Sequence, residues 1–224
     1  MTQLAAIDLS GNSARVALID STLRRAQIVS LEHVVAAEGE ASHDFLARLR
    51  QALPDRLDQV TISGDVGGLS TRSMRFPFGD LRKVDQTLPF EIEHLIPFDV
   101  DDVVLSWHVV ARSKSETSVL TAIAPKRALG EFLASLTAAG IEPRAIVHPA
   151  ATLAELVPKS KIPCAVLSIG ACETHLAVTT DRLCFARSVR MGGDDIDHAL
   201  AKKFGVATDQ AKLAKESGAQ IHAG

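Results

Sequence analysis

The apolar residues at the start of the chain fall in three short runs separated by polar turn residues. Residues 4–9 and 14–19 flank a Ser-Gly-Asn-Ser cluster, and residues 26–35 follow a second polar turn. Apolar runs bounded by turn-forming residues predict three consecutive β-strands. The next apolar positions recur with the period of a helix, which predicts a helix over residues 43–53. A further strand is predicted over residues 59–63.

The middle of the chain alternates between the strand period and the helix period. A strand is predicted over residues 72–76, and the apolar positions that follow predict a helix that starts at Leu81 and continues to Pro97. Pro89 lies inside this pattern, so a kink or break is expected there. Two strands (103–112 and 118–124) and two helices (125–139 and 150–157) complete this part.

The last part of the chain repeats the first. Strands are predicted over residues 164–169, 174–178 and 183–189, and the first two of them follow the opening pair at a constant offset of 160 residues. Each pair encloses a turn that contains glycine. Two such units predict a duplicated α/β core with a cleft between its halves, and a chance similarity between two β-meanders is the alternative. Helices over residues 194–204 and 208–217 follow.

Composition and charge mainly argue against certain partners, targeting segments and metal sites. The net charge of −3 and the pI of about 6.2, without a basic face, argue against nucleic acid as a partner. The N-terminus lacks the basic and apolar regions of a signal peptide, and the sequence has no run of 18 apolar residues. The three cysteines, Cys164, Cys172 and Cys184, have no metal-ligand spacing, so we expect buried thiols in a reducing cytoplasm.

Aromatic residues gather in the middle of the chain. Four phenylalanines are expected mainly to form a core there, with part of their surface left for a partner: Phe76, Phe78, Phe90 and Phe98. Trp107 is expected in the same core or at an edge that a partner contacts. Glu91 and Glu93 lie two positions apart and do not share a helix face, so we expect a solvated surface instead of an acid–base pair.

Several of these segments resemble known families. Residues 6–16 and 167–174 are similar to the two phosphate loops of the superfamily of actin, heat-shock ATPases and sugar kinases, whose hairpin amides cradle the phosphates of ATP. Phe-Glu-Ile-Glu-His-Leu-Ile-Pro-Phe at 90–98 and Arg-Ser-Val-Arg-Met-Gly-Gly at 187–193 resemble PilM-type pilus proteins. Ala211 and Lys215 fall on that family's Ala-Glu-x-x-Lys helix, with Lys212 in place of the acid. The cytoplasmic part of GspL shares the resemblance, and FtsA shares it more distantly.

The resemblance implies an α/β protein with the actin-like fold, in which two RNase H-like subdomains carry a small inserted α+β domain. The first subdomain would take residues 1–70 and 146–160, the inserted domain residues 71–145, and the second subdomain residues 161–224. The second half of this superfamily normally continues with more strands and an adenosine-binding loop. The second subdomain is therefore expected to be incomplete.

The resemblance also carries over a nucleotide-phosphate site, residue by residue. This site would consist of residues from both loops. In the first loop they are Asp8, Ser10, Gly11, Asn12, Ser13 and Arg15, and in the second loop they are Gly170, Ala171 and Thr174. Ser168 stands where the family has an aspartate that positions Mg²⁺ or the attacking water, and a serine supplies neither the charge nor a base. We therefore expect no catalytic residue and no metal ligand. Two alternatives stay open, binding of ATP and Mg²⁺ without turnover and hairpins that are only structural turns.

Resemblance to PilM and GspL implies a cytoplasmic scaffold of a type IV pilus or type II secretion platform. The implied partners are the motor ATPase, a cytoplasmic segment of a PilN- or GspM-like membrane subunit, and a second copy in a homodimer. The chain would lie peripherally at the inner membrane or be the cytoplasmic part of a single-pass protein. Two other functions stay open, an actin-like ATPase or kinase that hydrolyses ATP and an FtsA-like filament former.

Overall fold

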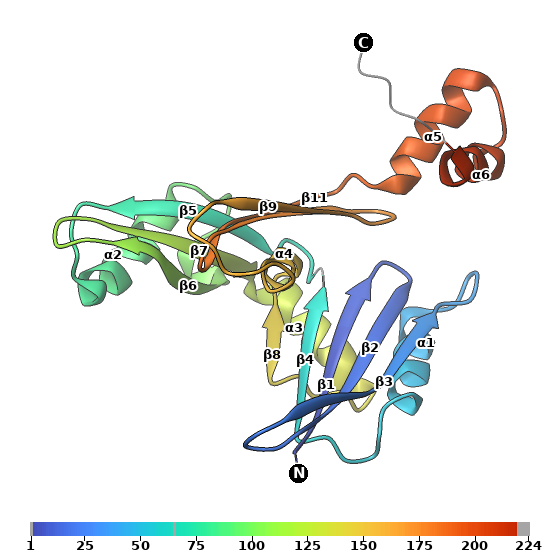
Figure 1. Ribbon diagram of the computed structural model, residues 1–224, viewed down its shortest axis with the longest axis horizontal. Helices are drawn as coiled ribbons and strands as arrows, with labels where there is room; N and C mark the ends of the chain where they lie inside the picture. The colour runs from blue at the N-terminus through green and yellow to red at the C-terminus, as the bar shows by residue number, and fades with distance from the viewer. Residues whose placement is uncertain (1, 65, 219–224) are drawn as a thin grey trace.

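The computed structural model describes residues 2–64 and 66–218, which form three separate β-sheets and six α-helices. Figure 1 shows the first sheet at the bottom of the molecule, the second sheet at the left, and the third sheet above the first and beside the second. The last two helices project from the third sheet toward the upper right. The chain therefore places its opening repeat and its closing repeat in different sheets.

The first sheet has the strand order β3-β2-β1-β4-β8. Its strands β1, β2 and β3 form an antiparallel meander, and β4 and β8 then add to β1 in parallel. The bounds in that order along the chain are Thr2–Ser10, Ser13–Ser21, Ala26–Val35, Gln59–Gly64 and Ala145–Val147. The strands predicted from the opening apolar runs are therefore confirmed, with ends that differ by a few residues.

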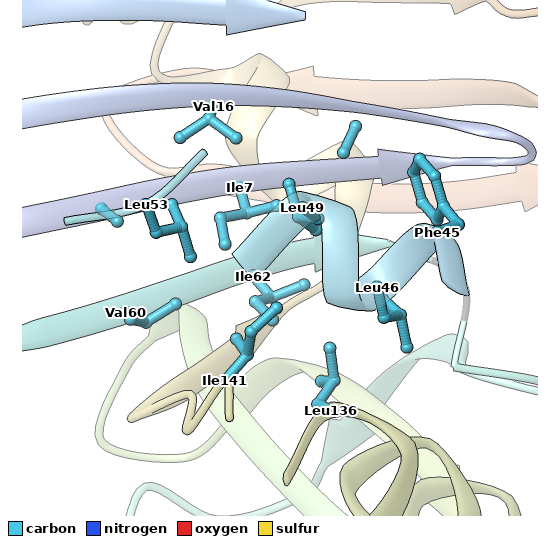
Figure 2. Close-up of a cluster of buried hydrophobic side chains, with 12 residues drawn as sticks. Ile7, Val16, Phe45, Leu46, Leu49, Leu53, Val60, Ile62, Leu136 and Ile141 are labelled. Atoms are coloured by element: carbon cyan, nitrogen blue, oxygen red, sulfur yellow. The ribbon is translucent and has the colours of Figure 1, made fainter. Parts of the chain in front are cut away.

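The core of the first sheet lies on one face, under α1 (Ser42–Gln51) and α3 (Lys126–Ala138). Alternate residues of a strand point to opposite faces, so Ile7 turns inward and is only 2% exposed. On α1, Leu49 is fully buried against this face. Figure 2 shows these side chains converging with Leu136 of α3. Burial of this shared apolar face holds both helices on the sheet.

The second sheet has the order β5-β7-β6, with α2 packed on one of its faces. Its elements are β5 (Ser70–Phe76), α2 (Leu81–Glu93), the short 3₁₀ helix η1 (Val100–Asp102), β6 (Val103–Arg112) and β7 (Thr117–Pro125). The Asp80 side chain caps α2 by accepting the amide of Arg82 at 2.9 Å. The prediction that this helix reaches Pro97 is wrong, because Pro97 disfavours helical backbone at the residue before it.

The third sheet is an antiparallel meander in the order β11-β10-β9. Its elements and the helices around it are α4 (Pro149–Ala154), β9 (Cys164–Ile169), β10 (Thr174–Thr179), β11 (Leu183–Val189), α5 (Gly193–Phe204) and α6 (Thr208–Gly218). Gly205 ends α5 with a left-handed φ of 66°. The three strands reproduce the order and direction of β1, β2 and β3, as the repeat predicted. The division of the chain into three domains stays a prediction.

Two expectations about burial are wrong. Cys164 and Cys172 are exposed, because Cys164 begins the edge strand β9 and Cys172 lies at the tip of the β9–β10 hairpin. Phe76 is buried, but Phe90 and Phe98 are 68% and 47% exposed. The buried side of α2 is set by residues four apart, and Phe90 falls on its other side. Only part of the aromatic group therefore forms the predicted core.

Candidate functional site

The tips of the two predicted phosphate loops face each other. A Cβ placed on Gly11, in the β1–β2 turn, would lie 3.9 Å from Sγ of Cys172 in the β9–β10 turn. A Cβ placed on Gly170 would lie 4.0 Å from Oγ of Ser10. Gly11 has a left-handed φ of 56°, which lets the first turn close tightly. The fold therefore brings the two sets of predicted site residues together, although about 160 residues separate them in sequence.

Several polar groups of the first loop already have partners within the protein. Asp8 and Arg15 are paired across β1 and β2, and their side chains form an ion pair at 3.5 Å. The Ser13 hydroxyl donates to the carbonyl oxygen of Ser10 at 3.2 Å. The carbonyl oxygen of Asn12 accepts the amide of Ala36 at 2.7 Å. A phosphate at this turn would have to compete with Asp8 for the Arg15 guanidinium.

The second loop is bound to the start of α5. The amides of Gly193 and Asp194 donate to the carbonyl oxygens of Gly170 and Ala171 at 2.8 and 2.9 Å. The Thr174 hydroxyl donates to the carbonyl oxygen of Met191 at 2.7 Å. These bonds fix the loop against the helix, but they also occupy Thr174 and the amides at the helix N-terminus, where an anion would otherwise bind.

Three carboxylates lie near the thiol at the tip of the second loop, although Arg190 pairs with one of them, Glu173, at 4.0 Å. The pKa of the Cys172 thiol is raised, first by loss of solvation, then by its hydrogen bond to the Asp194 carboxylate at 3.5 Å, and then by the charges of Asp194, Asp195 and Glu173. A raised pKa keeps the thiol neutral, which makes it a poor nucleophile and a poor metal ligand. The same carboxylates oppose the approach of a triphosphate.

The two loops differ in the carboxylate that they could offer to a Mg²⁺ ion bound with a nucleotide. The facing turns have the shape of a phosphate cradle, and Asp8 supplies one carboxylate. Ser168 supplies none, and it lies on β9 opposite His175 of β10. Mg²⁺ that orders a phosphate and a water is usually held by one or two carboxylates together with the phosphates. Whether the facing turns bind a phosphate or Mg²⁺ stays a prediction.

A cleft that the sequence did not indicate lies on the other face of the second sheet. It has a volume of about 320 Å³, and its walls are mainly apolar. Residues from seven elements and the segment before β5 line it: Val66, Leu69, Thr71, Val104, Ser106, Trp107, His108, Leu120, Ala122, Ala124, Leu129, Ile146, Val147, His148, Ala151, Leu183 and Ala186. A volume of this size accommodates a few apolar side chains of a ligand.

Hydrogen bonds join the rim of this cleft to β11 and to the turn before it. Thr71 donates its hydroxyl proton to the carbonyl oxygen of Ala186. The His108 ring lies 2.8 Å from the carbonyl oxygen of Leu183, and the Arg182 guanidinium donates to that of Val109 at 3.2 Å. These contacts hold the second sheet and the third sheet on either side of the cleft.

A polar chain connects the cleft wall with the second loop. His148 begins α4, and its Nδ1 accepts the amide of Ala150 at 3.1 Å. Its Nε2 lies 3.5 Å from Oγ of Ser188, which lies 2.7 Å from Nδ1 of His175. His175 is on β10, directly after the loop, with Nε2 3.8 Å from Glu173. These side chains form a continuous row of polar contacts from the wall of the cleft to the second loop.

Residues 2–64 and 66–218 contain neither a metal-binding cluster nor a helix that could span a membrane. No three His, Cys, Asp or Glu side chains come together as a group that could hold a metal ion. Likewise, none of the helices there combines the length and apolar character needed to cross a bilayer.

Comparisons with known proteins give a consistent result. The family model described as "Type IV pilus assembly protein PilM" matches residues 8–220. The structure is similar to a PilM–PilN type IV pilus biogenesis complex, at 20% identity and a TM-score of 0.76 over 96% of this chain and 69% of that one. It is also similar to the cytoplasmic domain of EpsL, an inner-membrane component of the Vibrio cholerae type II secretion system. That match has 18% identity and a TM-score of 0.57, over 84% of this chain and 71% of that one. The two matches establish a shared fold, and the predicted α/β fold class is confirmed.

Proposed function

Because the chain belongs to the family of the type IV pilus assembly protein PilM, we propose that it is a cytoplasmic scaffold of a bacterial pilus or type II secretion platform. In this role it holds a cytoplasmic segment of a PilN-like membrane subunit and a motor ATPase, and it works at the inner face of the inner membrane. A PilM–PilN complex among the similar structures supports the first of these partners.

The observation that carries the proposal is the apolar cleft between the second sheet, α4 and β11. Leu120 and Ala124 of β7 are 4% and 7% exposed and form part of its wall. The rim groups Thr71 and His108 already bond to backbone oxygens of β11. The remaining lining is mainly apolar, and it favours an extended peptide with apolar side chains that fit this volume, because burial of their surface removes it from water.

Filling the cleft is expected to weaken peptide binding. Ala122 lies in the middle of β7 and lines the cleft, so Ala122→Phe puts a ring where the peptide side chains would sit. We expect a synthetic peptide of the N-terminal cytoplasmic residues of a PilN-like subunit to bind at least about tenfold more weakly to this variant, a loss of roughly 1.4 kcal/mol. Isothermal titration calorimetry measures the difference.

Ser118→Phe is the matched control. Ser118 lies on the same strand and, at a spacing of four, on the same face, but it does not line the cleft. This variant is expected to bind the peptide as the unmodified chain does. Equal weakening in both variants would point to a general disturbance of the second sheet, and unchanged binding in Ala122→Phe would contradict the cleft as the peptide site.

Nucleotide is expected to bind weakly and without turnover. The reasons are the Asp8–Arg15 ion pair, the absence of an acid at Ser168 and the carboxylates around the second loop. Titration of the chain with Mg·ATP in a calorimeter should give a Kd weaker than about 10 μM, which corresponds to less than roughly 7 kcal/mol. Tighter binding together with release of phosphate would favour the ATPase alternative.

A further inference from the structure

The second sheet has an exposed apolar corner on the side away from the cleft. Phe90, Leu95 and Phe98 are 68%, 50% and 47% exposed, and they lie within nine successive residues at the end of α2. The cleft uses the sheet face that carries Leu120, whereas α2 covers the opposite face. Exposed large apolar side chains that cluster in this way mark interaction surfaces more often than isolated ones do.

The register of α2 fixes this exposure. Val84, Leu88 and Ile92 repeat every four residues and are buried against the sheet. Phe90 lies two residues from both Leu88 and Ile92, which turns it about 200° away from them on a helix with 100° per residue. The ring cannot enter the core unless the helix rotates and exposes Leu88 and Ile92. The fold therefore keeps an aromatic ring in solvent at this position.

Acidic residues are frequent around the corner, and no lysine or arginine accompanies them in this part of the sequence, although His94 lies among them. Between Lys83 and Arg112 there is no lysine or arginine, but there are six acids: Asp85, Glu91, Glu93, Asp99, Asp101 and Asp102. All six are exposed, and none forms an ion pair with a residue in the described part of the chain. The nearby Lys126 lies 2.6 Å from the main-chain oxygen of Asp101.

We propose that this acidic corner, formed by Phe90, Leu95 and Phe98 with the six carboxylates, docks a basic amphipathic helix of a partner protein. Apolar residues of the helix would cover the two rings, and its lysines or arginines would face the carboxylates. Such helices present anchors at i, i+3, i+4 and i+7 with charges on their flanks. The packing of η1 against α2 places Asp101 and Asp102 beside that helix, while Asp85 lies earlier on α2 and accepts the indole hydrogen of Trp107 at 3.1 Å.

The charge selects this occupant over two others. An anionic membrane surface would meet six carboxylates before it reached Phe90, so apolar insertion there is opposed by repulsion. Nucleic acid is opposed for the same reason. A basic protein segment gains from both features, because opposite charges steer the encounter and the rings are removed from water on contact.

A designed peptide tests the proposal on the whole chain. The probe is a fluorescein-labelled helix of about 18 residues, long enough to be partly helical alone, with leucines on one face and lysines on its flanks. We expect saturable binding by fluorescence anisotropy at about 50 mM salt that weakens at about 500 mM. Binding should weaken at least about tenfold in a Phe90→Ser, Phe98→Ser variant and in a Glu91→Lys, Glu93→Lys variant.

Matched controls place the changes elsewhere. Leu23→Ser with Leu156→Ser removes two exposed apolar residues outside the corner, and Glu142→Lys with Glu155→Lys makes the same change in net charge. Both should bind the probe normally. Equal loss in corner and control variants, binding of a charge-only oligolysine as tightly as the probe, or Phe90-dependent binding to anionic phospholipid vesicles would overturn the proposal. Self-association of the chain in analytical ultracentrifugation that is lost in the Phe90→Ser, Phe98→Ser variant would also overturn it, because a second copy would then occupy the corner.

Discussion

A Leu49→Ala variant is expected to unfold with a free energy about 3 kcal/mol lower than that of the unmodified chain. Leu49 is fully buried, and it joins α1 to the inner face of the first sheet beside Ile7 and Ile62 (Figure 2). Truncation of the side chain removes apolar contacts and leaves a cavity between α1 and the sheet. The helix and the sheet can close this cavity only in part. Urea denaturation followed by circular dichroism measures the change.

Leu23→Ala is the control for this substitution. Leu23 lies in the β2–β3 turn and is fully exposed, so removal of its side chain should change stability by less than about 0.5 kcal/mol. A small effect at Leu49, with an unchanged dependence on urea concentration, would mean that α1 is not packed as the structure has it.

A Gly192→Ala variant is expected to lose about 2–3 kcal/mol of stability and to displace the second loop. The added Cβ would lie 2.3 Å from the carbonyl oxygen of Ala171 and 2.7 Å from that of Gly170. Both are backbone atoms that accept the amides of Asp194 and Gly193, so neither can move without breaking a hydrogen bond. The backbone of Gly192 itself is extended and suits any residue, so the effect is steric.

Gly130→Ala is the matched control for the glycine. Gly130 lies inside α3, and a Cβ there meets nothing within 4 Å. The same chemical change should therefore raise the free energy of unfolding, by about 0.5–1 kcal/mol, because alanine favours a helix more than glycine does. Denaturation gives both stabilities, and amide exchange at residues 170–174 reports on the loop. Two changes of the same sign would contradict the contact at Gly192.

The strand pattern was predictable because it is a local property. Apolar runs between glycine and serine turns gave β1, β2 and β3 and again β9, β10 and β11, and the bounds of β3, β6, β9 and β11 match the predicted ranges. The repeat predicted two halves with a cleft between them, and Gly11 and Cys172, which lie in the turns of the two halves, are next to each other. Whether those residues bind nucleotide stays a prediction.

The cleft, the exposure of Phe90 and the acids around Cys172 depend on contacts between distant segments, which no local sequence pattern encodes. The run at residues 118–124 is apolar on both faces, which signals a strand covered on both sides, but it does not say that one side faces a cleft toward α4 and β11. The exposure of Phe90 follows only from the register of α2. From the sequence alone, an aromatic residue in an apolar segment is expected to be part of a core. Likewise, the acids around Cys172 come from two different segments that meet in the fold.

The central claim is that the apolar cleft holds a segment of a membrane partner, and photo-crosslinking tests it most directly. A peptide of the N-terminal cytoplasmic residues of a PilN-like subunit would carry a benzophenone side chain in place of one apolar residue. After irradiation with the whole chain, mass spectrometry should locate the cross-links on cleft residues such as Leu129, Ala151 and Leu183. Cross-links confined to the two loops or to α2, or efficient labelling that persists in Ala122→Phe, would contradict the claim.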